Sequence, residues 1–95
     1  MNMENSMYME KIREHISVGD EATRTTHLKA CAAYLYGDAA IYQYECALCG
    51  DDVGQDIAIK LEEACKKVID ASIIDVVGEF QDVKAKVQVL MDHLS

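Results

Sequence analysis

The strongest constraint on the fold is a regular apolar repeat near the end of the chain. Apolar residues follow one another there at alternating intervals of four and three positions. They are Ile69, Ile73, Val76, Phe80, Val83, Val87, Leu90 and Leu94. An α-helix places residues at this spacing on one face, and a stripe held over about 25 residues is typical of a helix that packs along another helix. We call this stripe the C-terminal seam.

A second stripe lies just upstream, formed by Ile57, Leu61, Ala64 and Val68. Together the two stripes predict a C-terminal helical segment over residues 55–95. One unbroken helix of that length would be about 60 Å long at 1.5 Å per residue, far longer than a compact domain of this size. Either the segment breaks near Gly78 into an antiparallel hairpin, or it projects from the domain and pairs with another chain.

The rest of the chain also favours helices, because it contains no proline and only five glycines. Residues 1–19 predict an N-terminal helix with Met9, Ile12 and Ile16 on one face. Gly19 is then expected to end this helix, and Asp20 to cap the start of the next.

Residues 20–50 predict a helical hairpin with its turn at the sequence "YGD", residues 36–38. The second arm, "AAIYQYECALCG", fits a helix through Ile41, Tyr44 and Leu48, but alternating apolar and polar residues also fit a strand. The helical surroundings favour the helix. The predicted fold is therefore a single all-α domain of three to four helices, with a helical hairpin and a long C-terminal helix that carries the seam.

Two cysteines in the fragment "YECALCG" suggest a metal site. Zinc takes four nitrogen or sulfur ligands, which structural sites supply as two close pairs. Cys46 and Cys49 form one pair, and His27 and Cys31 form a second. A turn at Gly37–Asp38 would bring the pairs together. The seven-residue fragment also resembles a zinc knuckle, which implies the same metal.

The favoured interpretation, however, is that the thiols are buried, because reduced cysteine packs as a small apolar residue. Two cysteines at i, i+3 share a helical face without any metal, and redox chemistry is a third interpretation. Cys65 lies alone in "LEEACKK" and is expected at the edge of the core. No cofactor is therefore expected, and Zn²⁺ is the one that the sequence leaves open.

Charge and composition exclude several classes of function. The net charge of −8 disfavours direct binding to nucleic acid. No apolar run is long enough for a membrane span, and no signal peptide is visible, so we expect a cytoplasmic protein that does not bind membranes. No catalytic motif is present, which predicts a protein that is not an enzyme. Asp51, Asp52 and Asp56 are interpreted as charges at a helix N-terminus, and His15 and His93 as surface residues.

Four tyrosines flank the predicted turn: Tyr34, Tyr36, Tyr42 and Tyr44. Tyrosine is common in interfaces because it combines a large ring with a polar tip. These residues are therefore candidates for a surface that binds a partner or a small ligand. Alternatively, they close the open end of the hairpin.

The sequence thus predicts a small acidic protein that binds another protein as an adaptor, regulator or inhibitor. We expect it to form a homo-oligomer, in the first instance a dimer, through the C-terminal seam. One alternative is a zinc-binding regulatory module with His27, Cys31, Cys46 and Cys49 as ligands. Another is a phage-type inhibitor or a protein that sequesters a small ligand.

Overall fold

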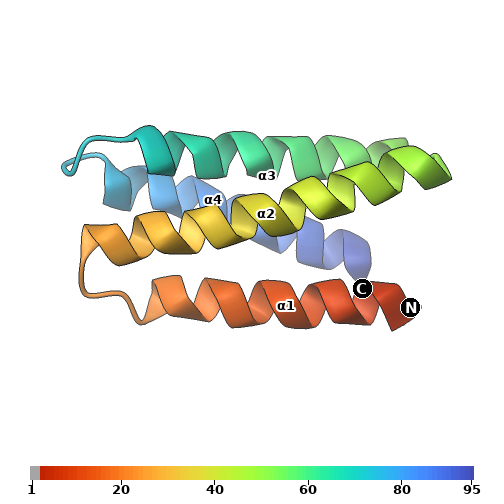
Figure 1. The fold of residues 1–95 in the computed structure, drawn as a ribbon, viewed down its shortest axis with the longest axis horizontal. Helices are drawn as coiled ribbons and strands as arrows, with labels where there is room; N and C mark the ends of the chain where they lie inside the picture. Colours follow the sequence, from red (N-terminus) through yellow and green to blue (C-terminus); the bar gives the residue numbers. More distant parts are fainter. Residues whose placement is uncertain (1–2) are drawn as a thin grey trace.

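The computed structural model describes residues 3–95, which form four helices. These are α1 (Met3–Asp20), α2 (Thr25–Cys49), α3 (Asp52–Asp70) and α4 (Val76–Leu94). Consecutive helices run in opposite directions, so the chain is an up-down-up-down bundle with both ends at the same end of the molecule (Figure 1). The prediction of an all-α fold is confirmed.

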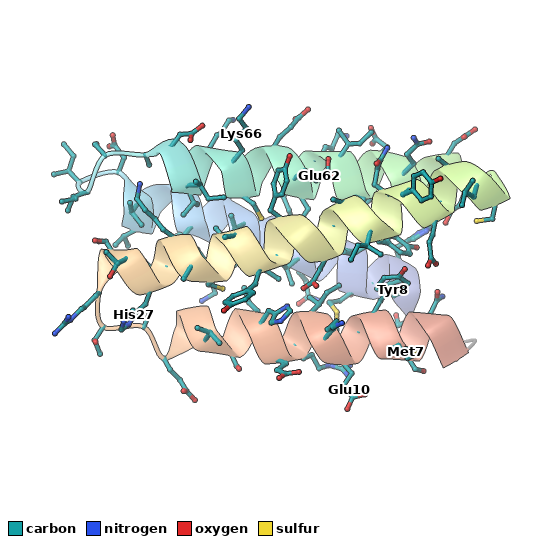
Figure 2. All side chains as sticks on the ribbon, viewed as in Figure 1. Met7, Tyr8, Glu10, His27, Glu62 and Lys66 are labelled. Carbon is teal, nitrogen blue, oxygen red and sulfur yellow. The ribbon has the colours of Figure 1, made fainter. Side chains whose placement is uncertain are left out.

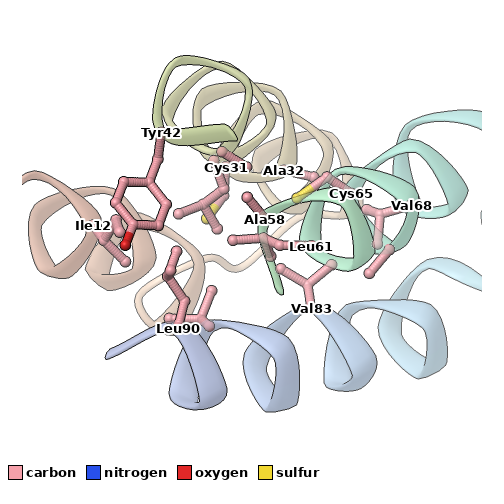
Figure 3. Packing of buried hydrophobic residues seen from close by; sticks show 14 of the residues in the cluster. Ile12, Cys31, Ala32, Tyr42, Ala58, Leu61, Cys65, Val68, Val83 and Leu90 are labelled. Atoms are coloured by element: carbon pink, nitrogen blue, oxygen red, sulfur yellow. The ribbon is translucent and has the colours of Figure 1, made fainter. Parts of the chain in front are cut away.

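Helix α2 is the centre of the bundle. It packs most extensively on α3 and also contacts α1 and α4, whereas the described helices α1 and α3 lie diagonally and do not touch. Side chains from all four helices meet in one core, as seen for Ile12, Tyr42, Leu61 and Leu90 (Figure 3). The core is therefore shared by all four described helices.

The C-terminal seam lies mostly inside this core. Six of its eight residues are buried, namely Val76, Phe80, Val83, Val87, Leu90 and Leu94. They face the upstream stripe of α3, where Leu61, Ala64 and Val68 are also buried. The seam was predicted to hold another chain, and this was wrong for the six residues of α4, because the other three helices of the same chain cover them.

The hairpin between α3 and α4 forms, but not at Gly78. The helix ends at Asp70 and restarts at Val76, while Gly78 lies inside α4. Lys29 of α2 donates hydrogen bonds to the carbonyl oxygens of Ile69 (2.7 Å) and Ala71 (2.6 Å). A cation at these otherwise unpaired carbonyls stabilises a helix C-terminus. Ile69 and Ile73, the remaining seam residues, lie at this break and are exposed.

The hairpin predicted within residues 20–50 is absent. Helix α2 runs through Gly37 and Asp38 without a turn, and it contains no strand. Residues on both sides of Gly37 are buried against the neighbouring helices, including Leu35 and Ala39. Burial of these flanking turns outweighs the roughly 1 kcal/mol that glycine costs in a helix interior.

The helix ends agree with the sequence only in part. Gly19 lies one residue before the end of α1, where packing requires it, because an added Cβ would lie 2.4 Å from Cζ of Phe80. The N-cap of α2 is Arg24, not Asp20, and it has no side-chain capping bond. Helix α3 begins three residues before the predicted position 55, at Asp52.

The turn between α2 and α3 is specified locally. Gly50 has φ of +78°, the left-handed conformation that glycine adopts at helix C-termini. The Asp51 carboxylate then caps α3 by accepting a hydrogen bond from the Gly54 amide at 2.9 Å. The interpretation of Asp51 and Asp52 as charges at a helix N-terminus is confirmed, and Asp56 lies one turn further along α3.

Candidate functional site

The four predicted zinc ligands lie along one helix and are not brought together. His27 and Cys49 are separated by 22 positions of continuous helix, about 33 Å at 1.5 Å per residue. His27 lies beside the α1–α2 loop, at the other end of the bundle from Cys49 (Figure 2). The site was predicted from a turn at Gly37–Asp38, and without that turn the two pairs cannot share one ion within a single chain.

Three of the thiols are buried in the core, where they pack as small apolar groups. Burial raises the pKa of Cys31, Cys46 and Cys65, in the case of Cys65 to about 12. A protonated thiol is a poor nucleophile and a poor metal ligand. Only Cys49 is exposed. Among the side chains of residues 5–95, no three from His, Cys, Asp or Glu are arranged to hold a metal ion.

A polar cluster nevertheless forms at the end of the bundle where α2 turns into α3. His93 of α4 bonds to the Asp51 carboxylate at 3.0 Å, and the Cys46 thiol lies 3.9 Å from the same carboxylate. The hydrogen bond from His93, followed by that from the Gly54 amide, lowers the pKa of Asp51. These contacts tie the C-terminus of α4 to the α2–α3 turn. His93, expected as a free surface residue, is therefore half-buried and paired.

A second polar contact joins α1 to the middle of α2. The buried Asp38 carboxylate accepts a hydrogen bond from Nδ1 of His15 at 2.5 Å, and the His15 ring stacks on Tyr34. This pair explains how a carboxylate can lie inside the helix interface, because a buried polar group requires a hydrogen-bond partner. His15 was expected on the surface, but its position is set by this contact.

The four tyrosines point in different directions because they share one helix. Tyr42 is buried and packs edge-on against Tyr8 with ring centroids 5.0 Å apart. Tyr34, Tyr36 and Tyr44 are exposed. The predicted cluster around a turn therefore does not exist, but Tyr34 and Tyr44 contribute to a different surface.

That surface is the side of α2 that faces away from the bundle, which we call the outer face of α2. It consists of Ala30, Ala33, Tyr34, Gly37, Ile41, Tyr44 and Leu48. Its larger members are more than half exposed, at 57% for Tyr34 and Ile41, 65% for Tyr44 and 71% for Leu48. None of these seven residues is charged, and the exposed Glu45 lies at the border of the face beside Ile41.

The outer face continues a groove between α1 and α2 of about 560 Å³. Met7 and Ile41 supply apolar side chains to the groove. Its charged residues are Glu10, Lys11 and Glu14 of α1 and Asp38 and Glu45 of α2. Large exposed apolar surfaces of this kind commonly mark binding sites for other molecules. The outer face is thus the strongest candidate for a functional site.

The sequence contained a signal for this face that the predicted turn concealed. Positions 30, 33, 37, 41, 44 and 48 follow one another at helical intervals of three and four, like the C-terminal seam. A turn at Gly37–Asp38 divided the stripe in two. The side of α2 that remains exposed could be identified only once the neighbours of α2 were known.

Comparisons with known proteins give no relative to guide the choice of function. No protein-family model, no curated protein and no solved structure matches this chain. None of the described helices is both long enough and apolar enough to cross a membrane.

Proposed function

We propose that this chain acts without catalysis, by binding another protein through the outer face of α2. The observation that carries the proposal is the exposure of Tyr34, Ile41, Tyr44 and Leu48 on the helix that otherwise forms the centre of the bundle. Aromatic and large aliphatic side chains in such clusters supply most of the binding free energy in protein interfaces.

The stability of the bundle does not require these side chains. Every helix already contributes buried residues to the core, and α2 itself contributes Cys31, Leu35 and Tyr42 on its opposite side. An apolar side chain left in water forgoes about 25 cal/mol for each Å² that burial would remove from solvent. A partner with an apolar surface would recover that free energy.

A capture experiment tests the proposal. The tagged protein is compared with Ile41→Glu and with Val89→Glu, a matched change at a half-exposed position of α4 away from the outer face. We expect a bound protein, identified by mass spectrometry, to be recovered with the wild type and with Val89→Glu but not with Ile41→Glu. Equal recovery with all three would refute the proposal, provided that circular dichroism shows the same helix content for each.

A further inference from the structure

We infer that the partner of the outer face is a second copy of this chain, docked with its α2 antiparallel. This inference rests on the proposed function, because it uses the same surface. It adds the identity of the partner and the register of the two helices.

The sizes of the side chains make the face complementary to itself. Its N-terminal half carries the small residues Ala30, Ala33 and Gly37, and its C-terminal half carries Ile41, Tyr44 and Leu48. An antiparallel copy centred at the level of Ala39 places Leu48 opposite Ala30 and Ile41 opposite Gly37. Leu48 and Ile41 then fill the space above small residues, as in well-packed helix pairs, whereas Tyr34 and Tyr44 of opposing copies lie at one level.

The two tyrosines fit the same register. Tyr34 and Tyr44 of opposing copies lie at the same level, but they are about 80° apart around the helix axis at 3.6 residues per turn. They therefore flank the contact on opposite edges and do not collide. The stack of Tyr34 on His15 holds its ring at the α1 edge.

The area of the face suits a weak, reversible dimer. An aromatic side chain offers about 150–250 Å², so the four large residues at their observed exposures present roughly 450 Å². The small residues between them and Met7 beside Ile41 extend this area. A standard interface buries about 800 Å² per partner, so a contact of roughly 450 Å² per copy is at the small end of the range, where association is weak and reversible.

Charge favours a second copy over a basic partner. The chain has a net charge of −8, yet the seven residues of the outer face carry no charge themselves, and the acidic side chains of Glu10, Glu14 and Glu45 lie along one border of the face, in the groove toward α1. Two acidic copies repel each other, and a charge-free face is where they approach at the lowest electrostatic cost. Added salt screens the repulsion, so the dimer is expected to tighten with salt, whereas pairing with a basic partner would weaken.

Gly37 is consistent with a close approach from outside. An added Cβ at this position would meet no atom of the chain within 4 Å. Packing within the chain therefore does not require glycine here, although glycine lowers helix stability by about 1 kcal/mol. In the antiparallel pair, the Ile41 side chain of the second copy occupies the space in front of Gly37.

Light scattering coupled to size-exclusion chromatography tests the dimer. We expect twice the monomer mass for the wild type and for Val89→Glu, and the monomer mass for Gly37→Ile, which places two isoleucines in one space. Ile41→Gly removes the filling residue and is expected to weaken association. An equimolar mixture of Gly37→Ile and Ile41→Gly restores one large and one small residue at each contact and is expected to recover the dimer.

A charge pair tests the orientation. Glu at position 30 of one copy and Lys at position 48 of the other lie side by side only if the helices are antiparallel. Ala30→Glu and Leu48→Lys are therefore each expected to be monomeric alone and to form heterodimers when mixed. In a parallel pair the two positions are about 27 Å apart at 1.5 Å per residue, and mixing would have no effect. Formation of a wild-type dimer without heterodimers on mixing would overturn the antiparallel register.

Failure of this inference differs from failure of the proposed function. A wild-type monomer that still captures another protein through Ile41 overturns the dimer and leaves the proposed function in place. If the wild type is a monomer and captures no protein in a way that depends on Ile41, both the inference and the proposed function are overturned. A dimer that persists in Gly37→Ile shows that copies associate through another surface, which also overturns the inference.

Discussion

The C-terminal seam of α4 and the outer face of α2 are apolar stripes of the same kind, but the first is buried in the core and the second is exposed to solvent. Both repeat at intervals of three and four residues, and both include large apolar side chains. Phe80 is 3% exposed, whereas Tyr44 is 65% exposed. Periodicity therefore shows that a helix has an apolar face, but it does not show whether the same chain or another molecule covers that face.

The largest expected difference between the two stripes concerns folding. Phe80→Ala removes a buried ring and leaves a cavity, so we expect the free energy of unfolding to fall by about 3–5 kcal/mol. Tyr44→Ala changes an exposed side chain and is expected to alter the stability of the monomer by less than about 0.5 kcal/mol. Urea denaturation at a protein concentration low enough to avoid association measures both, and equal losses would contradict the assignment of inner and outer faces.

A smaller effect is expected from the polar contact on the inner side of α2. His15→Ala leaves the Asp38 carboxylate buried without its partner, which costs about 1–3 kcal/mol. Lys60→Ala breaks the exposed ion pair with Asp56 and is expected to cost less than about 1 kcal/mol. Thermal melting of the two variants compares them. A loss for Lys60→Ala as large as that for His15→Ala would mean that burial of Asp38 adds nothing.

Replacing two glycines with alanine also compares the inner and outer faces, without changing any charge. Gly19→Ala forces a methyl group against the Phe80 ring, and we expect a loss of about 1–3 kcal/mol in unfolding free energy. Gly37→Ala adds a methyl group where the chain has open space, so the monomer is expected to gain up to about 1 kcal/mol from helix propensity. Denaturant midpoints of dilute protein give both values. Changes of the same sign would show that Gly37 faces a neighbour within the chain.

The smallest effect is expected at the turn that joins α2 to α3. Asp51→Ala removes the cap of α3 and should cost about 1 kcal/mol at neutral pH. Because the pKa of Asp51 is lowered in the folded state, its contribution is complete above the ordinary carboxyl pKa of about 4 and is lost as the pH falls below it. The difference in stability between wild type and Asp51→Ala should therefore shrink on acidification.

Asp56→Ala is the matched control, because Asp56 is exposed and pairs with the exposed Lys60. Stability measured between neutral and acid pH should show a smaller dependence on this residue. If Asp56→Ala matched Asp51→Ala across that range, the capping hydrogen bond would not be the source of the effect.

The sequence was a good guide wherever the signal was local. The helical character of the chain, the left-handed Gly50 and the acidic start of α3 all follow from residues within one or two turns of each position. It was a poor guide to the number of helices between residues 20 and 50, because "YGD" is a turn signal only where nothing buries its flanks. The predicted zinc site does not form either, because only a turn at that point would have brought the two pairs of ligands together.

The sequence alone determined that the chain is helical and which residues share a face, because the helical repeat is a property of the backbone. The tertiary structure decided which faces are covered and where the third helix ends. Burial of apolar surface is not directional, so a stripe accepts any apolar neighbour. The end of α3 depends on Lys29, forty residues away in sequence from Ile69, and only folding brings those two groups together.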